Sequence, residues 1–134
     1  MTKTKTKSAT KAKPQEKKIL LGHVGVDSGQ LLITDPCYLH DWKDNPPEGE
    51  ERPCKGLYSY SYDGACSATG AEGKFGGALR FALGHEGAGV ALSTGFGDGV
   101  YPVYAYVRDC GEWGPRVVRV EVEFADEDDE SEEG

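Results

Sequence analysis

The sequence predicts an all-β fold, or a mainly β fold with one short helix, arranged as a compact antiparallel sandwich or a partly open barrel of about eight strands. Short runs rich in Val, Leu, Tyr and Phe recur along the chain, and most are separated by glycines, of which there are 19 in 134 residues. Several runs alternate apolar with polar residues, as half-buried strands do. No repeat of the length found in solenoids or propellers occurs.

The expected elements follow in chain order. Residues 19–26 and 30–34 are typical of strands, and the intervening Asp27–Gly29 favours a tight turn, so we expect a hairpin. Asp35 can cap a short helix that ends near Trp42. Further strands are expected at residues 78–83, at residues 100–107 and where Tyr58, Tyr60 and Tyr62 alternate.

The last strand has the clearest pattern. In residues 117–124, Val118, Val120, Val122 and Phe124 alternate with Val117, Arg119, Glu121 and Glu123. We expect the first set to face the core and the second set to face water.

Charged tails flank the predicted domain. Residues 1–18 contain seven lysines and one acid, and residues 125–134 contain seven acids and no base. Neither segment has enough apolar surface to offset the entropy of ordering. The sequence therefore predicts a disordered basic tail at 1–18, a single β domain at 19–124 and a disordered acidic tail at 125–134.

Composition limits the partners and the location. The net charge is −8, and the predicted domain is itself acidic, which argues against nucleic acid as its main partner. The N-terminal lysines could still contact nucleic acid weakly. No apolar run is long enough for a membrane span or a secretory signal, so we expect a cytoplasmic protein with free thiols.

A glycine-rich segment near residue 97 is the first candidate site. Its glycines would let a ligand approach the backbone, while side chains around it supply polar and aromatic contacts. A plain hairpin turn explains the same residues and is the favoured interpretation. The ligand-binding candidates are Asp35, Ser93, Thr94, Gly97, Asp98, Gly99, Tyr101 and Tyr104.

Two weaker candidates involve catalysis and metal binding. Cys37 lies near the start of the expected helix and His40 follows three residues later, so a thiol nucleophile with a base is conceivable, although cysteines are more often buried and inert. Asp35 and Asp98 could hold a hard cation if their turns meet. The sequence identifies no cofactor.

Two sequence blocks resemble a known family. They are VDSGQLLITDPCY at 26–38 and STGFGDGVYPVY at 93–104. Together they are similar to the domain of unknown function 4241 family of bacteria and their phages, over roughly residues 22–124. The resemblance implies a bacterial or phage setting and a cytoplasmic protein, and it carries no catalytic residues.

Three functions follow from these observations. The preferred hypothesis is a binding or accessory module that holds a small polar ligand or a peptide at the glycine-rich turn. A structural, assembly or host-interaction protein of a phage, with protein partners, is the second. A hydrolase or transferase that uses Cys37 or an aspartate-bound metal is the third.

Overall fold

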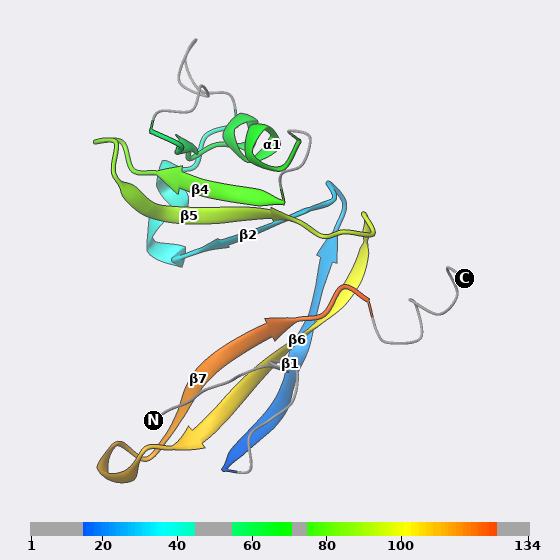
Figure 1. The fold of residues 1–134 in the computed structure, drawn as a ribbon, viewed down its shortest axis with the longest axis vertical. Coiled ribbons are helices and arrows are strands. Elements are labelled where there is room, and N and C mark those ends of the chain that lie inside the picture. Colours follow the sequence, from blue (N-terminus) through cyan, green and yellow to red (C-terminus); the bar gives the residue numbers. More distant parts are fainter. Residues whose placement is uncertain (1–14, 45–54, 71–74, 126–134) are drawn as a thin grey trace. The chain divides into compact units, whose positions relative to one another are not determined.

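The computed structural model describes residues 15–44, 55–70 and 75–125. The chain divides into two compact units: unit 1 comprises residues 1–25 and 99–134, and unit 2 comprises residues 26–98. The described residues form two sheets of seven strands in total, with one α-helix of nine residues and no closed barrel (Figure 1). The prediction of a mainly β fold is therefore confirmed.

Unit 2 contains a four-stranded sheet. In their order across the sheet, its strands are β2 (Gln30–Thr34), β5 (Glu86–Ser93), β4 (Gly76–Arg80) and β3 (Tyr58–Ser59). β2 and β4 are antiparallel to β5, whereas β3 is parallel to β4. A short 3₁₀ helix, η1 (Pro36–Asp41), follows β2, and the helix α1 (Tyr62–Gly70) follows β3.

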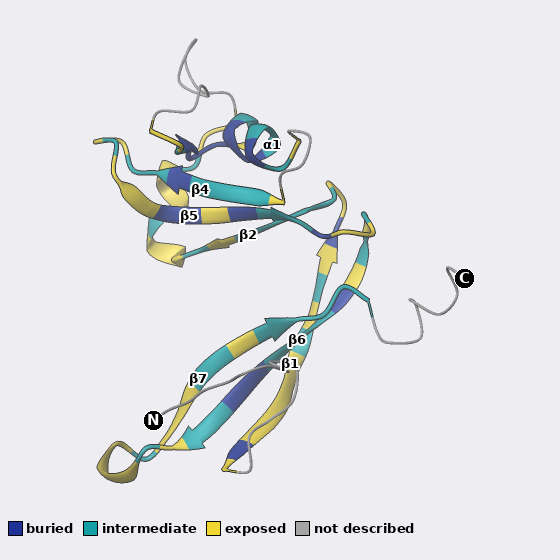
Figure 2. Ribbon diagram, in the orientation of Figure 1, coloured by how far each residue is buried: buried dark blue, intermediate teal, exposed yellow. Residues whose placement is uncertain are grey.

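The core of unit 2 lies between α1 and the sheet. Its buried members are small or aromatic: Tyr58, Tyr60, Ala65, Ala68, Leu79, Ala88 and Ala91. Figure 2 shows buried segments on α1, β4 and β5. At Gly64 a Cβ atom would overlap the carbonyl oxygen of Ser59, so only glycine lets α1 approach β3 this closely.

Unit 1 contains a three-stranded sheet. In their order across the sheet, its strands are β1 (Glu16–Val26), β6 (Gly99–Asp109) and β7 (Pro115–Val122). β6 and β7 are antiparallel, with a bulge between Tyr106 and Val107, and the 3₁₀ turn η2 (Gly111–Trp113) joins them. In this register Tyr106 lies opposite Arg119, so both side chains project from the same face of the sheet.

That face carries a group of side chains that we call the charged cluster: Glu16, Lys18, Tyr104, Tyr106, Arg108, Arg119 and Glu121. The Glu16 side chain is 1% exposed, and its carboxylate oxygens lie 3.2 Å from the Arg119 guanidinium and 3.6 Å from that of Arg108. A carboxylate this deeply buried requires such partners, because removing an unpaired charge from water is costly.

Aromatic rings complete the charged cluster. Tyr106 is fully buried and donates a 2.6 Å hydrogen bond to Glu121. The other carboxylate oxygen of Glu121 lies 3.6 Å from Lys18 Nζ, which also lies 4.2 Å from the centre of the Tyr104 ring. Arg119 lies 4.0 Å from the centre of the Tyr106 ring. Cation–π contacts of this kind add to the ion pairs.

The expected orientation of the last strand is wrong at Val120 and at its neighbours. Val120 is 59% exposed, whereas the Arg119 and Glu121 side chains are 29% and 14% exposed within the charged cluster. The difference lies at the centre of the strand, where Arg119 and Glu121 are covered and Val120 is not, whereas Val118 and Val122 are half-buried. Ion pairs and tyrosine rings contributed by the neighbouring strands cover the face that carries Arg119 and Glu121, and the β7 sequence contains no sign of them.

Two other expectations about the elements are also wrong. Residues 19–26 and 30–34 do not form a hairpin, because β1 is in a sheet with β6 and β2 pairs with β5. The strand expected along the tyrosines ends at Ser59, and Tyr62 begins α1. Ser61 explains this switch, because its hydroxyl accepts a hydrogen bond from Gly64 N, as helix-capping residues do.

The tail boundaries can be compared only in part. β1 begins at Glu16, so residues 16–18 of the predicted basic tail belong to a strand and not to a tail. Residues 1–14 and 126–134 lie outside the described residues. The single domain expected at residues 19–124 stays a prediction.

Candidate functional site

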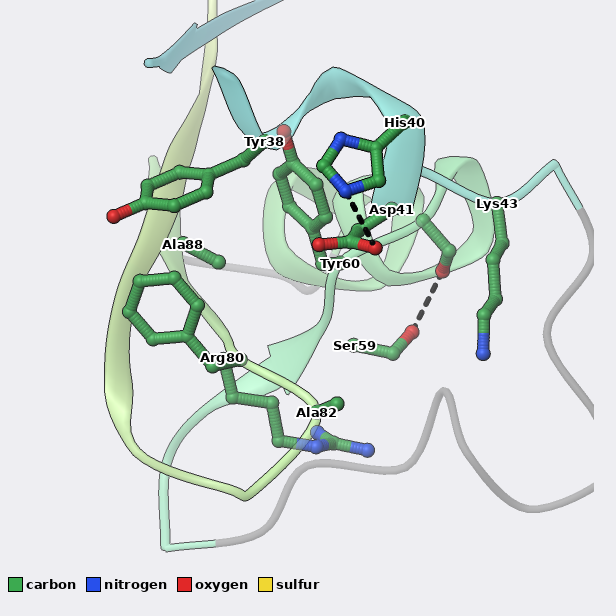
Figure 3. Close-up of a pocket in the computed structure, with 11 residues that line it drawn as sticks. Tyr38, His40, Asp41, Lys43, Ser59, Tyr60, Arg80, Ala82 and Ala88 are labelled. Carbon is green, nitrogen blue, oxygen red and sulfur yellow. Dashed lines mark hydrogen bonds and ion pairs between the residues drawn. The ribbon is translucent and has the colours of Figure 1, made fainter. Parts of the chain in front are cut away.

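A cavity of about 500 Å³ lies within unit 2. Its lining comes from η1 and the segment after it, from β3 and the two residues that precede α1, from the end of β4 and the turn after it, and from β5 (Figure 3). The lining residues are Tyr38, His40, Asp41, Lys43, Ser59, Tyr60, Ser61, Arg80, Phe81, Ala82 and Ala88. This volume is typical of small-molecule sites.

Local hydrogen bonds position the segment that contributes Tyr38 to Lys43. Asp35 caps η1, because its carboxylate accepts a 3.0 Å bond from Cys37 N. After η1, Lys43 lies beside the β3–α1 segment, with Lys43 N donating to Tyr60 O and Lys43 O accepting from Tyr62 N at 2.9 Å. Side chains distant in sequence are thereby held against one cavity.

Aromatic residues form one wall of the cavity. Thr34 donates its hydroxyl proton to Ala88 O, so the 2.8 Å bond between Thr34 and Tyr60 is donated by the tyrosine. Tyr38 packs edge-on against Phe81, with ring centres 5.0 Å apart. Hydrogen bonding and edge contacts fix these rings, so the wall is preformed.

Two buried serines line the cavity near the start of α1. Ser61 Oγ accepts from Gly64 N at 2.9 Å, and Ser59 Oγ lies 2.6 Å from Ser61 Oγ (Figure 3). Ser59 is 5% exposed and Ser61 is fully buried. The hydroxyl groups of both serines are therefore held in place by their bond to each other and by the bond from the start of α1.

Charged side chains complete the lining. Arg80 donates a 2.9 Å hydrogen bond to Leu57 O, which holds its guanidinium at the cavity. Lys43 contributes a second positive charge. Asp41 lies 3.4 Å from His40 Nε2, and both side chains are largely exposed. In Figure 3 this pair lies apart from Lys43 and Arg80.

The glycine-rich turn has structural bonds of its own. Thr94 is fully buried, and its hydroxyl donates to Gly97 O at 2.7 Å and lies 3.3 Å from Gly29 O. Ser93 Oγ accepts from Gly95 N at 3.3 Å. These bonds close the turn and join it to the β1–β2 connection. The turn links β5 to β6, which lie in different sheets, so the hairpin interpretation is wrong although the bonds of the turn are structural.

Within unit 2, Asp35 does not lie beside the glycine-rich turn. Gln30 pairs with Ser93 and Thr34 pairs with Gly89, so Asp35 and the turn that contains Asp98 lie at opposite ends of β2. A five-residue strand separates them by about 17 Å. Gly99, Tyr101 and Tyr104 belong to unit 1. The condition for a shared cation site, that the turns of Asp35 and Asp98 meet, is therefore not fulfilled. No group of three potential metal ligands occurs among the described residues.

Of the two catalytic candidates, His40 lines the cavity and Cys37 does not. Cys37 is exposed and does not line the cavity. Desolvation, followed by the charge of Asp35, a hydrogen bond to Asp35 and the charge of Asp41, raises the pKa of its thiol, whereas a nucleophilic cysteine needs a lowered pKa. His40, in contrast, lines the cavity.

Sequence reasoning missed most of the cavity. Lys43, Ser59, Ser61 and Arg80 come from three separated segments, and none belongs to a recognisable motif. Arg80 falls within the strand expected at residues 78–83, and a charged residue in an alternating strand is no sign of a site. The one available signal was Asp35 as a helix cap, because that cap fixes the position of His40 and Asp41.

The comparisons with known proteins identify a family and nothing more specific. A family model described as a protein of unknown function, DUF4241, matches residues 7–113. Searches of curated proteins and of solved structures gave no match. Within the described residues, no helix is long and apolar enough to cross a membrane. Since the match covers most of the sequence and contains both motif blocks, the chain belongs to the DUF4241 family of proteins of unknown function.

Proposed function

We propose that this protein is a binding module and that the cavity of unit 2 holds a small anionic ligand. The observation that carries the proposal is the convergence of Lys43 and Arg80 on one preformed cavity. Both of these cationic side chains line the cavity, although the whole chain has a net charge of −8. Local positive charge on an acidic protein favours an anion at that place.

The uncharged lining supports a small organic ligand. Tyr38, Tyr60 and Phe81 provide apolar surface, while Ser59 and Ser61 provide hydroxyls. Small-molecule sites typically combine an apolar wall with a few fixed polar groups. A peptide ligand would instead require an extended groove or a strand edge.

The competing functions have less support. A thiol-dependent hydrolase or transferase would need Cys37 at the cavity with a lowered pKa, and neither condition is met. An assembly function through the charged tails concerns residues that lie mainly outside the described ranges. That function, like a cytoplasmic location in bacteria or phage-infected cells, stays a prediction.

A blocking variant tests the proposal without knowledge of the natural ligand. Ala82 is exposed and lines the cavity, so Ala82→Phe would fill part of it at little cost to folding. Leu83→Phe is the matched control, because Leu83 is 91% exposed in the same turn and does not line the cavity. Melting temperatures would be measured with phosphate, citrate, benzoate and adenosine 5′-monophosphate.

We expect at least one probe to raise the melting temperature of the wild type and of Leu83→Phe but not of Ala82→Phe, since a ligand stabilises only the state that binds it. If every stabilising probe acts equally on Ala82→Phe, or if no probe stabilises the wild type, the proposal is wrong.

A further inference from the structure

We infer that the ligand is a small aromatic acid, a flat ring that carries one carboxylate. This inference rests on the proposed function, which requires only an anion, and it specifies the chemistry of the same cavity. The ring follows from the aromatic wall, and the position of the carboxylate follows from the buried hydroxyl groups of Ser59 and Ser61 (Figure 3).

Three rings form the aromatic wall, and their neighbours hold them in place. Tyr60 is 8% exposed, its hydroxyl is bonded to Thr34, and the Trp42 ring meets it at 90° with ring centres 5.1 Å apart. Tyr38 and Phe81 meet at 83°. Rings held in this way present flat surfaces that need no further ordering when a ligand binds, so they favour a ligand that is itself flat and rigid.

Small side chains leave room for a ring in the same cavity. Ala82 and Ala88 belong to the lining and contribute one methyl group each. Ala88 is buried, and its carbonyl oxygen accepts the hydroxyl proton of Thr34, so its backbone is fixed. The cavity of about 500 Å³ therefore accommodates one ring or two fused rings. A flexible chain of the same size would lose more conformational entropy in this fixed space.

The serine pair has one hydroxyl proton to offer. Ser59 and Ser61 share a 2.6 Å hydrogen bond, which uses one of their two protons, and the Gly64 amide donates to Ser61 Oγ without using the other. Within the described part of the chain, neither serine has an acceptor for that second proton. Ser59 is 5% exposed and Ser61 is fully buried, so Ser59 is the one that a ligand reaches. A buried donor without an acceptor is costly, and an oxygen of the ligand fits there.

A single carboxylate suits the charged part of the lining better than a more highly charged group. Lys43 and Arg80 line the cavity, but both also have interactions within the protein, and one of these is the bond from Arg80 to Leu57 O. A ligand with one negative charge therefore suits them better than a ligand with two. A carboxylate brings one charge, and one of its oxygens can accept the proton from Ser59.

Isothermal titration calorimetry on the full chain, at one fixed salt concentration, compares flat and saturated acids of the same charge. The aromatic acids are benzoate and 2-naphthoate, and their saturated counterparts are cyclohexanecarboxylate and decahydronaphthalene-2-carboxylate. Benzamide is the neutral counterpart of benzoate. We expect at least one aromatic acid to bind about fivefold more tightly than its saturated counterpart, because contacts between rings add to the burial of apolar surface. Benzamide should bind more weakly than benzoate.

Tyr38→Leu tests the contact with the ring, because it removes the aromatic side chain and keeps an apolar one. Binding of the best aromatic acid should weaken about fivefold, whereas its saturated counterpart should bind as before. Phe96→Leu is the matched control, since Phe96 is 62% exposed in unit 2 and does not line the cavity. An equal loss for both acids in Tyr38→Leu would mean that Tyr38 is only structural, and the inferred ring contact would be wrong.

Ser59→Ala tests the position of the carboxylate. Ser61 Oγ keeps the bond from the Gly64 amide, so α1 keeps its cap. Binding of the best aromatic acid should weaken about fivefold, because one hydrogen bond to its carboxylate is lost. Ser67→Ala is the matched control, since Ser67 lies on α1 and does not line the cavity. Unchanged binding in Ser59→Ala would contradict the inferred position of the carboxylate.

Failure of the inference can be distinguished from failure of the proposed function. If citrate or phosphate binds in an Ala82-dependent way and no aromatic acid binds more tightly than its saturated counterpart, the cavity is an anion site but the inferred ring is wrong. If benzamide binds as tightly as benzoate, or if no anion binds, the proposed function itself is wrong. Binding of an aromatic acid that Ala82→Phe leaves unchanged would lie outside the cavity and would overturn both.

Discussion

Units 1 and 2 are both built on small β-sheets, but their interiors have different chemistry. Unit 2 buries alanines, a leucine and two tyrosines between its sheet and α1. On the sheet of unit 1, Tyr106 and the Glu16 side chain are almost fully buried, and they are held by arginines, a lysine and a second glutamate. Burial of apolar side chains therefore accounts for the stability of unit 2, whereas paired charges contribute substantially to the stability of unit 1.

The difference predicts different responses to mutation, salt and pH. Apolar packing depends little on salt, whereas exposed and half-exposed ion pairs are screened by it. The chain has two tryptophans, and they divide conveniently, with Trp42 in unit 2 and Trp113 in unit 1. Fluorine NMR of fluorotryptophan-labelled protein during urea titration therefore reports on each unit separately, and coincident transitions would support the single domain expected from the sequence.

The largest effect is expected from Leu79→Ala in unit 2. Leu79 is fully buried, so truncation should lower the free energy of unfolding by about 2–5 kcal/mol. The Trp42 signal should move to lower urea. Val120→Ala is the control in unit 1, where the side chain is 59% exposed and the loss should be well below 1 kcal/mol. A small effect of Leu79→Ala would contradict the placement of the core beneath α1.

A smaller effect is expected from Glu16→Gln in unit 1. The change leaves Arg108 and Arg119 facing a neutral amide, and it should cost about 2 kcal/mol at low salt. The cost should shrink as salt is added, because both arginines are partly exposed. Glu112→Gln, at an exposed position, should have no effect on the Trp113 transition. If the cost of Glu16→Gln were independent of salt, packing and not charge would hold this face.

Thr94 distinguishes a structural turn from a ligand site. Thr94→Val removes the bonds to Gly97 O and Gly29 O and should lower the free energy of unfolding of unit 2 by about 1–2 kcal/mol. Thr94→Ser keeps the hydroxyl and should cost less. A ligand role would be favoured if Thr94→Val left the urea midpoint unchanged while it abolished binding of a probe.

The smallest effect concerns alkaline pH. Burial, then the hydrogen bond to and the charge of Glu121, raise the pKa of Tyr106. Desolvation alone would lower the pKa of Lys18, but the charge of Glu121 and other neighbouring groups raise it overall. Both groups therefore hold their protons more tightly in the folded state than in the unfolded state.

The direction of the pH effect follows from these shifts. The stability that both groups contribute is complete below their unfolded pKa values, near 10, and is lost as pH rises through the higher folded values. We expect the Trp113 urea midpoint to fall above pH 10. Tyr106→Phe should start about 1 kcal/mol less stable and show a shallower fall, since one of these two shifted groups is removed and Lys18 remains. Tyr104→Phe is the control, and an unchanged slope in Tyr106→Phe would contradict the role of Tyr106.

Local sequence determined much of this protein. Glycines between short segments with alternating apolar residues were sufficient to predict a mainly β fold, because the two-residue period of a strand is visible within a single segment. The Asp35 cap was visible for the same reason, since a cap and the amide it accepts from are two residues apart. The two motif blocks were sufficient to identify the DUF4241 family.

The pairing of the strands and the lining of the cavity became visible only in the tertiary structure. Whether β1 would join β2 or β6, and whether Val120 or Glu121 would be covered, depends on contacts between segments that no local pattern encodes. The cavity has the same origin, because Lys43 and Arg80 are 37 positions apart and line one cavity only when η1, β3 and β4 are assembled. Burial and charge pairing are properties of that assembly, and single segments do not specify them.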